Sequence, residues 1–279
     1  MLQGGDAPLK QLHVISGLPR SGSTLLSALL RQNPRFHAGI ASPVHALVIA
    51  TLDQMNPSRE FGAFFTERRR CAVLRGLFAT CYADAGSDDV VFDSNRMWTG
   101  QAALLRRLFP RIRIICCVRE IGWIINSIEL MLRRNPLQTS RLFDFKSGTS
   151  FYARVQGLMH TDVGNIGLAL GELRQAWFGE DAERLIVVRY ESLVRDPGSV
   201  MTRIYQEIGE PAFEHDFENL DYDAPEFDAR IGMPGLHKVT GRVRSENPEP
   251  IIPPEIFAKY ADISFWNHAP QNPRGVLVI

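Results

Sequence analysis

The sequence predicts an α/β fold in which a central parallel sheet lies between two layers of helices. Four apolar runs of strand length alternate with segments of helix length, a pattern typical of parallel strands joined by crossover helices. The runs are nearly continuous, which indicates strands buried on both faces. In such a sheet ligands bind beyond the carboxyl ends of the strands, so the residues after each run are candidates for a functional site.

Local start and stop signals support each element. Ser42 and Pro43 form an N-cap and a first helical position, and the helix that follows continues to about Met55. Pro110 and Gly209 end two later helices. The predicted strands are His13–Gly17, Val90–Asp93, Ile112–Val118 and Leu185–Arg189. The other predicted helices are Thr24–Arg31, Trp98–Phe109, Glu120–Arg134 and Ser192–Ile208.

The composition is that of an ordinary globular protein, with 45% of the 279 residues hydrophobic and 22% charged. We predict a single domain, 1–279, with an α/β core at 11–210 and an irregular C-terminal wrap at 211–279. Since 31 basic residues balance 31 acidic ones, no overall field favours nucleic acid, and any anion site must be local. No run approaches the roughly 18 apolar residues of a membrane span, and no signal peptide is evident. We therefore expect a cytoplasmic protein without stable membrane insertion, of undetermined oligomeric state.

The segment His13–Leu26 predicts an anion-binding loop. It places a tight turn between a strand and a helix, where free backbone N–H groups and the helix dipole favour an anion. Gly17 and Gly22 have the spacing of a Walker A loop, but no lysine follows Gly22, and the only cation in the loop is Arg20. The sequence therefore predicts a P-loop-like fold whose loop holds a phosphate or phosphosulfate chain without the usual triphosphate machinery.

A second anion site is predicted after the third strand. Arg119 follows that strand directly, and Ser127 lies eight residues later on the next predicted helix. Residues at this interval can converge on one group. An arginine and a hydroxyl suit a second, separate phosphate.

The two sites together resemble the donor-binding sites of the sulfotransferases. Pro19–Leu26 is similar to their 5′-phosphosulfate-binding loop, and Arg119 with Ser127 resembles their 3′-phosphate-binding pair. The likeness is to the tyrosylprotein sulfotransferases and bacterial relatives in particular. It extends to three further segments, Arg107–Pro110, Arg189–Val194 and Leu236–Gly241.

This resemblance implies a sulfuryl donor, 3′-phosphoadenosine 5′-phosphosulfate (PAPS), whose product is adenosine 3′,5′-bisphosphate (PAP). It also implies that Tyr190 lies near the adenine and that Lys238 reaches the 3′-phosphate side from the C-terminal wrap. An alternative role for Tyr190 is packing of its ring at the end of a strand. The predicted donor-binding residues are Pro19, Arg20, Ser21, Gly22, Ser23, Thr24, Arg119, Ser127, Tyr190, His237 and Lys238.

The catalytic residues are less clearly indicated. Sulfuryl transfer requires a base for the acceptor proton and cations for the charge on the leaving phosphate, a role that Arg20 fits. The tyrosylprotein enzymes have a glutamate after the phosphate loop, but segment 38–45 here contains no carboxylate. The candidate bases are therefore His45 and Asp93, with Arg96 predicted to stabilise the sulfuryl oxygens. Alternatively, His45 is structural, and Asp93 caps the next segment and pairs with Arg96.

The predicted activity is transfer of a sulfuryl group from PAPS to a hydroxyl or amine of a small-molecule, peptide or carbohydrate acceptor, with no metal required. Two alternatives stay open. The run Val90–Asp93 has the form of a Walker B strand, which would suit a divergent P-loop kinase or NTPase that needs Mg²⁺, although the loop lysine is absent. The other alternative is a nucleotide-binding protein without chemistry.

Overall fold

We describe the chain from a computed structural model, in which residues 11–134, 150–244, 249–268 and 272–279 are described. Six parallel strands form one sheet in the order β2-β3-β1-β4-β5-β8, which confirms the predicted parallel α/β sheet. Its strands are β1 (Gln11–Gly17), β2 (Phe36–Ala38), β3 (Val90–Ser94), β4 (Ile114–Val118), β5 (Leu185–Arg189) and β8 (Leu277–Val278).

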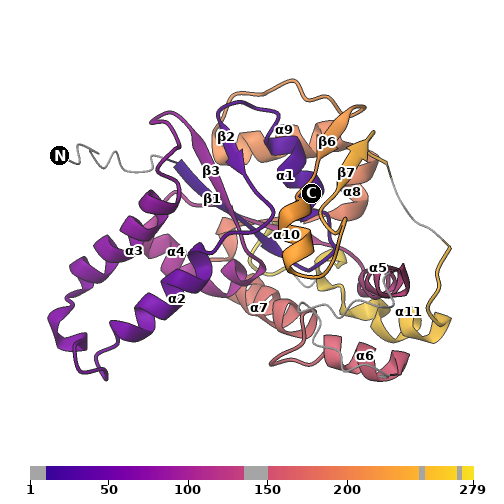
Figure 1. Cartoon of the computed structure of the whole chain (residues 1–279), viewed down its shortest axis with the longest axis horizontal. Coiled ribbons are helices and arrows are strands. Elements are labelled where there is room, and N and C mark those ends of the chain that lie inside the picture. The colour runs from indigo at the N-terminus through magenta and orange to yellow at the C-terminus, as the bar shows by residue number, and fades with distance from the viewer. Residues whose placement is uncertain (1–10, 135–149, 245–248, 269–271) are drawn as a thin grey trace.

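Helices cover both faces of this sheet and make three layers (Figure 1). One face packs against α1, α8 and α9, and the other packs against the remaining long helices. None of the described helices is long and apolar enough to cross a bilayer. The helices are α1 (Ser23–Leu30), α2 (Val44–Gln54), α3 (Glu67–Cys81), α4 (Ala102–Leu108), α5 (Ile121–Arg134), α6 (Phe151–Leu158), α7 (Gly167–Phe178), α8 (Tyr190–Arg195), α9 (Pro197–Ile208), α10 (Pro225–Arg230) and α11 (Pro254–Tyr260).

Strand β4 shows how the apolar run creates both cores. Successive side chains of a strand point to opposite faces, so Cys116 belongs to one core and Cys117 to the other. Both residues are fully buried, and burial raises the pKa of the Cys116 thiol to about 12. The adjacent cysteines therefore act as small apolar packing groups.

Residues of the C-terminal wrap return to the core in three places. Strands β6 (Leu220–Tyr222) and β7 (Val239–Gly241) pair antiparallel and lie against α1, next to α10 (Figure 1). Helix α11 packs on α5, and β8 adds a sixth strand beside β5. As a result, the segment around residues 236–244 lies beside the carboxyl end of β1, where both line one cavity.

Two predicted helices differ from the structure. The segment predicted as one helix over Ser192–Ile208 is two, α8 and α9. Asp196 has a non-helical backbone and its carboxylate accepts a hydrogen bond from the Ser199 N–H, while Pro197 starts α9. The segment Trp98–Phe109 begins as a 3₁₀ helix, η2 (Arg96–Gln101), before α4. Here the Asn95 side chain caps η2 by accepting from the Met97 N–H.

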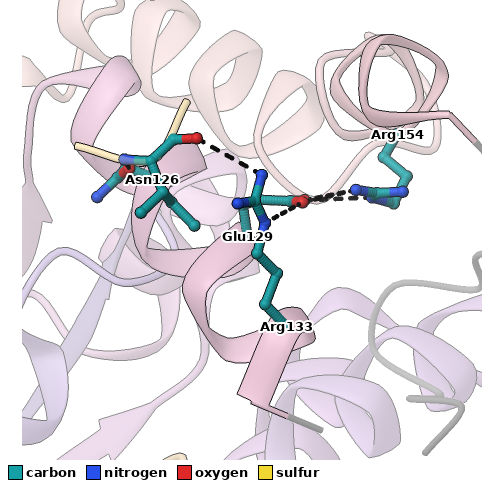
Figure 2. Close-up of polar contacts among 5 residues, drawn as sticks. Asn126, Glu129, Arg133 and Arg154 are labelled. Carbon is teal, nitrogen blue, oxygen red and sulfur yellow. Dashed lines mark hydrogen bonds and ion pairs between the residues drawn. The ribbon is translucent and has the colours of Figure 1, made fainter. Parts of the chain in front are cut away.

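A buried carboxylate fastens α5 to its surroundings (Figure 2). Glu129 is 4% exposed and accepts hydrogen bonds from Arg133 on the same helix and from Arg154 on α6. One turn earlier, the Asn126 side-chain oxygen accepts from the Ile251 N–H, 2.9 Å away. This cluster joins α5, α6 and the C-terminal wrap, and so fixes the helix that carries Ser127.

Candidate donor-binding site

A cavity of about 380 Å³ lies at the carboxyl ends of β1 and β3. The loop after β1, the residues at the end of β3, and the segment 236–244 line it. None of the described residues that line it is a carboxylate, although five are cations. Those cations are Arg20, Arg96, Lys238, Arg242 and Arg244.

The loop after β1 curls tightly so that the N-terminus of α1 meets the cavity. Gly17 has a φ of 103°, and a Cβ there would lie 2.3 Å from the Cys117 carbonyl oxygen, so only glycine fits. Arg20 has the left-handed φ of 56°, and Gly22, with a φ of 92°, is the N-cap of α1. The first N–H groups of α1 have no partner within the helix, and Ser23 and Thr24 line the cavity beside them.

Two other predicted loop residues differ in their exposure to the cavity. Pro19 lines it, whereas Ser21 is 1% exposed and its hydroxyl donates to the Pro19 carbonyl oxygen, 3.2 Å away. The Ser21 side chain therefore stabilises the loop from inside.

Arg20 joins three segments that are distant in sequence. Its Nε donates to the Ser127 hydroxyl on α5 at 3.2 Å, and its Nη1 donates to the Leu236 carbonyl oxygen at 2.9 Å. The structure thus brings together the loop, one member of the predicted second anion site, and the C-terminal wrap.

Arg119 connects to the same loop through an aromatic ring. Its guanidinium lies 4.0 Å from the centre of the Tyr190 ring, and a Cβ at Gly22 would lie 3.0 Å from that ring. Arg119 itself is 7% exposed, and neither Arg119 nor Ser127 is among the described residues that line the cavity. Tyr190 lines the cavity and therefore combines packing with access to a ligand.

Arg96, at the end of β3, lines the cavity and is held in place by hydrogen bonds. Its Nη1 donates to the Asn165 side-chain oxygen at 2.9 Å, and its backbone carbonyl accepts from the Ser16 hydroxyl at 2.7 Å. Burial lowers the pKa of this guanidinium. The alternative pairing of Arg96 with Asp93 does not occur.

The two candidate bases belong to one packed cluster. Asp93 is fully buried, and its two oxygens accept hydrogen bonds from the Tyr82 hydroxyl at 2.7 Å and the Trp98 Nε1 at 2.5 Å. His45 packs edge-on against Trp98, with 4.8 Å between ring centres, and burial lowers its pKa. Neither His45 nor Asp93 lines the cavity.

His237 and Lys238 reach the cavity from the C-terminal wrap. The Nδ1 of His237 lies 2.5 Å from a carboxylate oxygen of Asp228, which is fully buried. Burial and the charges of Arg20 and Arg96 lower the pKa of His237, and Asp228 opposes them. Lys238 is more exposed, and its Nζ lies 4.0 Å from Asp223.

Sequence reasoning missed three residues of this region. Arg242 and Arg244 line the cavity after β7, and their only sequence signal is an Arg-Val-Arg pattern in a lysine-poor, arginine-rich chain. Asp228 lies in an acidic segment where nothing local marks one carboxylate as buried.

The fold and the cavity define an α/β protein in which a tight loop after the first strand lines a cation-rich cavity. The family model described as "Sulfotransferase family" matches residues 14–215, and the chain belongs to that family. The predicted resemblance is thereby confirmed. A search of curated proteins finds no match.

Solved sulfotransferase structures share the fold. One from Alicyclobacillus acidocaldarius is 16% identical, with a TM-score of 0.51, over 80% of this chain and 90% of that one. The sulfotransferase STF1 from Mycobacterium tuberculosis H37Rv is 15% identical, with a TM-score of 0.50, over 75% of this chain and 70% of that one. These similarities support the P-loop-like three-layer architecture.

Proposed function

We propose that this sulfotransferase uses PAPS as its donor and binds it in the cavity after β1. The observation that carries the proposal is the cavity's charge: five cations and no carboxylate among its described lining residues, in a chain of formal net charge zero. Such a local concentration of arginines suits a ligand with several anionic groups.

The arrangement of these residues fits the two anionic ends of PAPS. In this proposal the α1 N-terminus, Arg20, Ser23 and Thr24 hold the 5′-phosphosulfate. Arg119 and Ser127, which contact the cavity-lining residues Tyr190 and Arg20, hold the 3′-phosphate, and Tyr190 lies beside the adenine. The hydrogen bond between Arg20 and Ser127 supports this placement because it joins a residue proposed to hold the 5′-phosphosulfate to one proposed to hold the 3′-phosphate.

The segment after β7 completes the proposed site. Lys238, Arg242 and Arg244 line the same cavity and add three cations from the C-terminal wrap. They would neutralise donor charge that the loop alone cannot balance.

The proposed reaction needs charge stabilisation rather than a metal. When PAPS is bound, it supplies an activated sulfuryl group for transfer to an acceptor hydroxyl or amine. Arg20 and Arg96 both line the cavity and would stabilise charge on the leaving phosphate and on the sulfuryl oxygens. Asp93 does not support the kinase alternative, because its two carboxylate oxygens already accept hydrogen bonds from Tyr82 and Trp98.

The proposal is tested by following PAPS in EDTA with a panel of phenols, alcohols and amines. We expect PAP to form together with a sulfated product. Arg20→Ala should lower the rate, whereas Arg203→Ala, which removes a half-exposed arginine of α9, should not. Consumption of ATP with Mg²⁺ while PAPS stays intact would contradict the proposal.

A further inference from the structure

A histidine and an aspartate form a hydrogen-bonded pair at the wall of the cavity. Asp228 on α10 is fully buried, and both of its oxygens are directed to one residue. One accepts from the His237 backbone N–H at 2.9 Å, and the other lies 2.5 Å from His237 Nδ1. This double contact fixes both the backbone and the ring of His237.

The contact also determines which ring nitrogen can accept a proton. A carboxylate beside Nδ1 favours the tautomer with its proton on Nδ1, and this leaves the lone pair on Nε2. Nε2 has no hydrogen-bond partner among the described residues, and the His237 side chain is 16% exposed. The rings of Phe227 and His237 contact each other edge-on, with 5.5 Å between their centres, and this contact supports the imidazole from one side.

The position of His237 relates it to the proposed sulfuryl site. Leu236, the preceding residue, accepts a hydrogen bond from Arg20 Nη1 at 2.9 Å. The charged groups that act on the imidazole are Asp228 from α10, Arg20 from the loop and Arg96 from η2. The ring therefore lies among the groups proposed to contact the transferred sulfuryl group.

We propose that His237, which the sequence analysis assigned to donor binding, is instead the general base for the acceptor and that Asp228 is its positioning residue. This proposal rests on the proposed function. Among the described residues that line the cavity, His237 is the one imidazole, and there is no carboxylate. His45 and Asp93 instead belong to the packed cluster around Trp98.

The proton and the electrons balance in this scheme. The acceptor oxygen forms a bond to sulfur while the bond from sulfur to the phosphate oxygen breaks, and that electron pair leaves with PAP. The acceptor proton passes to Nε2 of His237 and is then released to water. The Asp228 carboxylate stabilises the imidazolium that forms in between.

The first test separates turnover from donor binding. His237→Gln should lower kcat by about 10²–10⁴-fold and leave the PAP dissociation constant within about threefold of wild type. Asp228→Asn should lower kcat by about tenfold or more and displace the acid limb of the kcat profile to lower pH, because a charge that raises the imidazole pKa is removed. His215→Gln, a half-buried histidine of the same wrap that contacts Gln32, is the matched control and should keep both values.

The second test reads the imidazole without turnover. Nitrogen-15 spectra of the PAP complex should show His237 in the Nδ1–H tautomer, with a lower pKa in Asp228→Asn. An Nε2–H tautomer would overturn the proposal. The proposal would also be overturned if His237→Gln weakened PAP binding without lowering kcat, or if turnover were lost in His45→Gln and not in His237→Gln. Failure of the wild-type protein to bind PAP would instead refute the proposed function.

Discussion

A substitution at Asp93 tests whether its carboxylate has a structural or a catalytic role. Its buried carboxylate accepts from Tyr82 and from the fully buried Trp98. In Asp93→Asn the shape is kept, but the new amide N–H₂ faces one of these donors. The loss of one hydrogen bond to a charged group costs about 1.5–3 kcal/mol. At about 2–4 °C per kcal/mol for a domain of this size, the melting temperature should fall by about 3–12 °C.

The assay is thermal and urea unfolding of wild type, Asp93→Asn, Tyr82→Phe and the double variant. Tyr82→Phe should cost less, because Asp93 keeps the bond from Trp98 and the Tyr82 side chain is only partly buried. The two changes should be coupled by about 0.5 kcal/mol or more. An unfolding free energy within about 0.5 kcal/mol of wild type, with normal PAP binding and turnover lost, would refute the reasoning and restore Asp93 as the base.

Three further predictions concern other parts of the molecule. Glu129→Ala should destabilise the chain by about 3 kcal/mol in urea, because it removes a buried partner of Arg133 and Arg154; an unchanged midpoint would contradict this. Arg119→Ala should weaken PAP binding by about 1.5–3 kcal/mol in calorimetry and AMP binding much less, and equal losses would show that Arg119 does not contact the 3′-phosphate. Burial raises the pKa of Glu172 to about 7, so its contribution to stability is present below the unfolded pKa and is lost as pH rises through 7. Glu172→Gln should therefore raise the melting temperature at pH 8 more than at pH 5, and the opposite order would exclude this assignment.

The sheet core and the phosphate loop could be predicted because their signals are local. Apolar runs gave the four long strands, and glycine spacing gave the loop after β1. The edge strands Phe36–Ala38 and Leu277–Val278 were missed because three and two residues carry no periodic pattern. The break at Asp196 was missed because the apolar stripe runs across it.

The rest of the site depends on contacts that sequence cannot reveal. Arg20 meets Ser127 and Leu236 across 107 and 216 residues of chain. His45 and Asp93 lie in segments where a base is expected. The local sequence does not show that Trp98 packs against His45 and donates a hydrogen bond to Asp93. Likewise, no pattern in the sequence indicates that Asp228 pairs with His237.

The most direct test of the proposed donor is calorimetric titration in EDTA with PAP and AMP, beside ATP with Mg²⁺. PAP and AMP differ by the 3′-phosphate, which only a second anion site would recognise. We predict micromolar or tighter PAP binding and a loss of about 1.5–3 kcal/mol or more for AMP. Tighter binding of ATP with Mg²⁺ than of PAP would contradict the account.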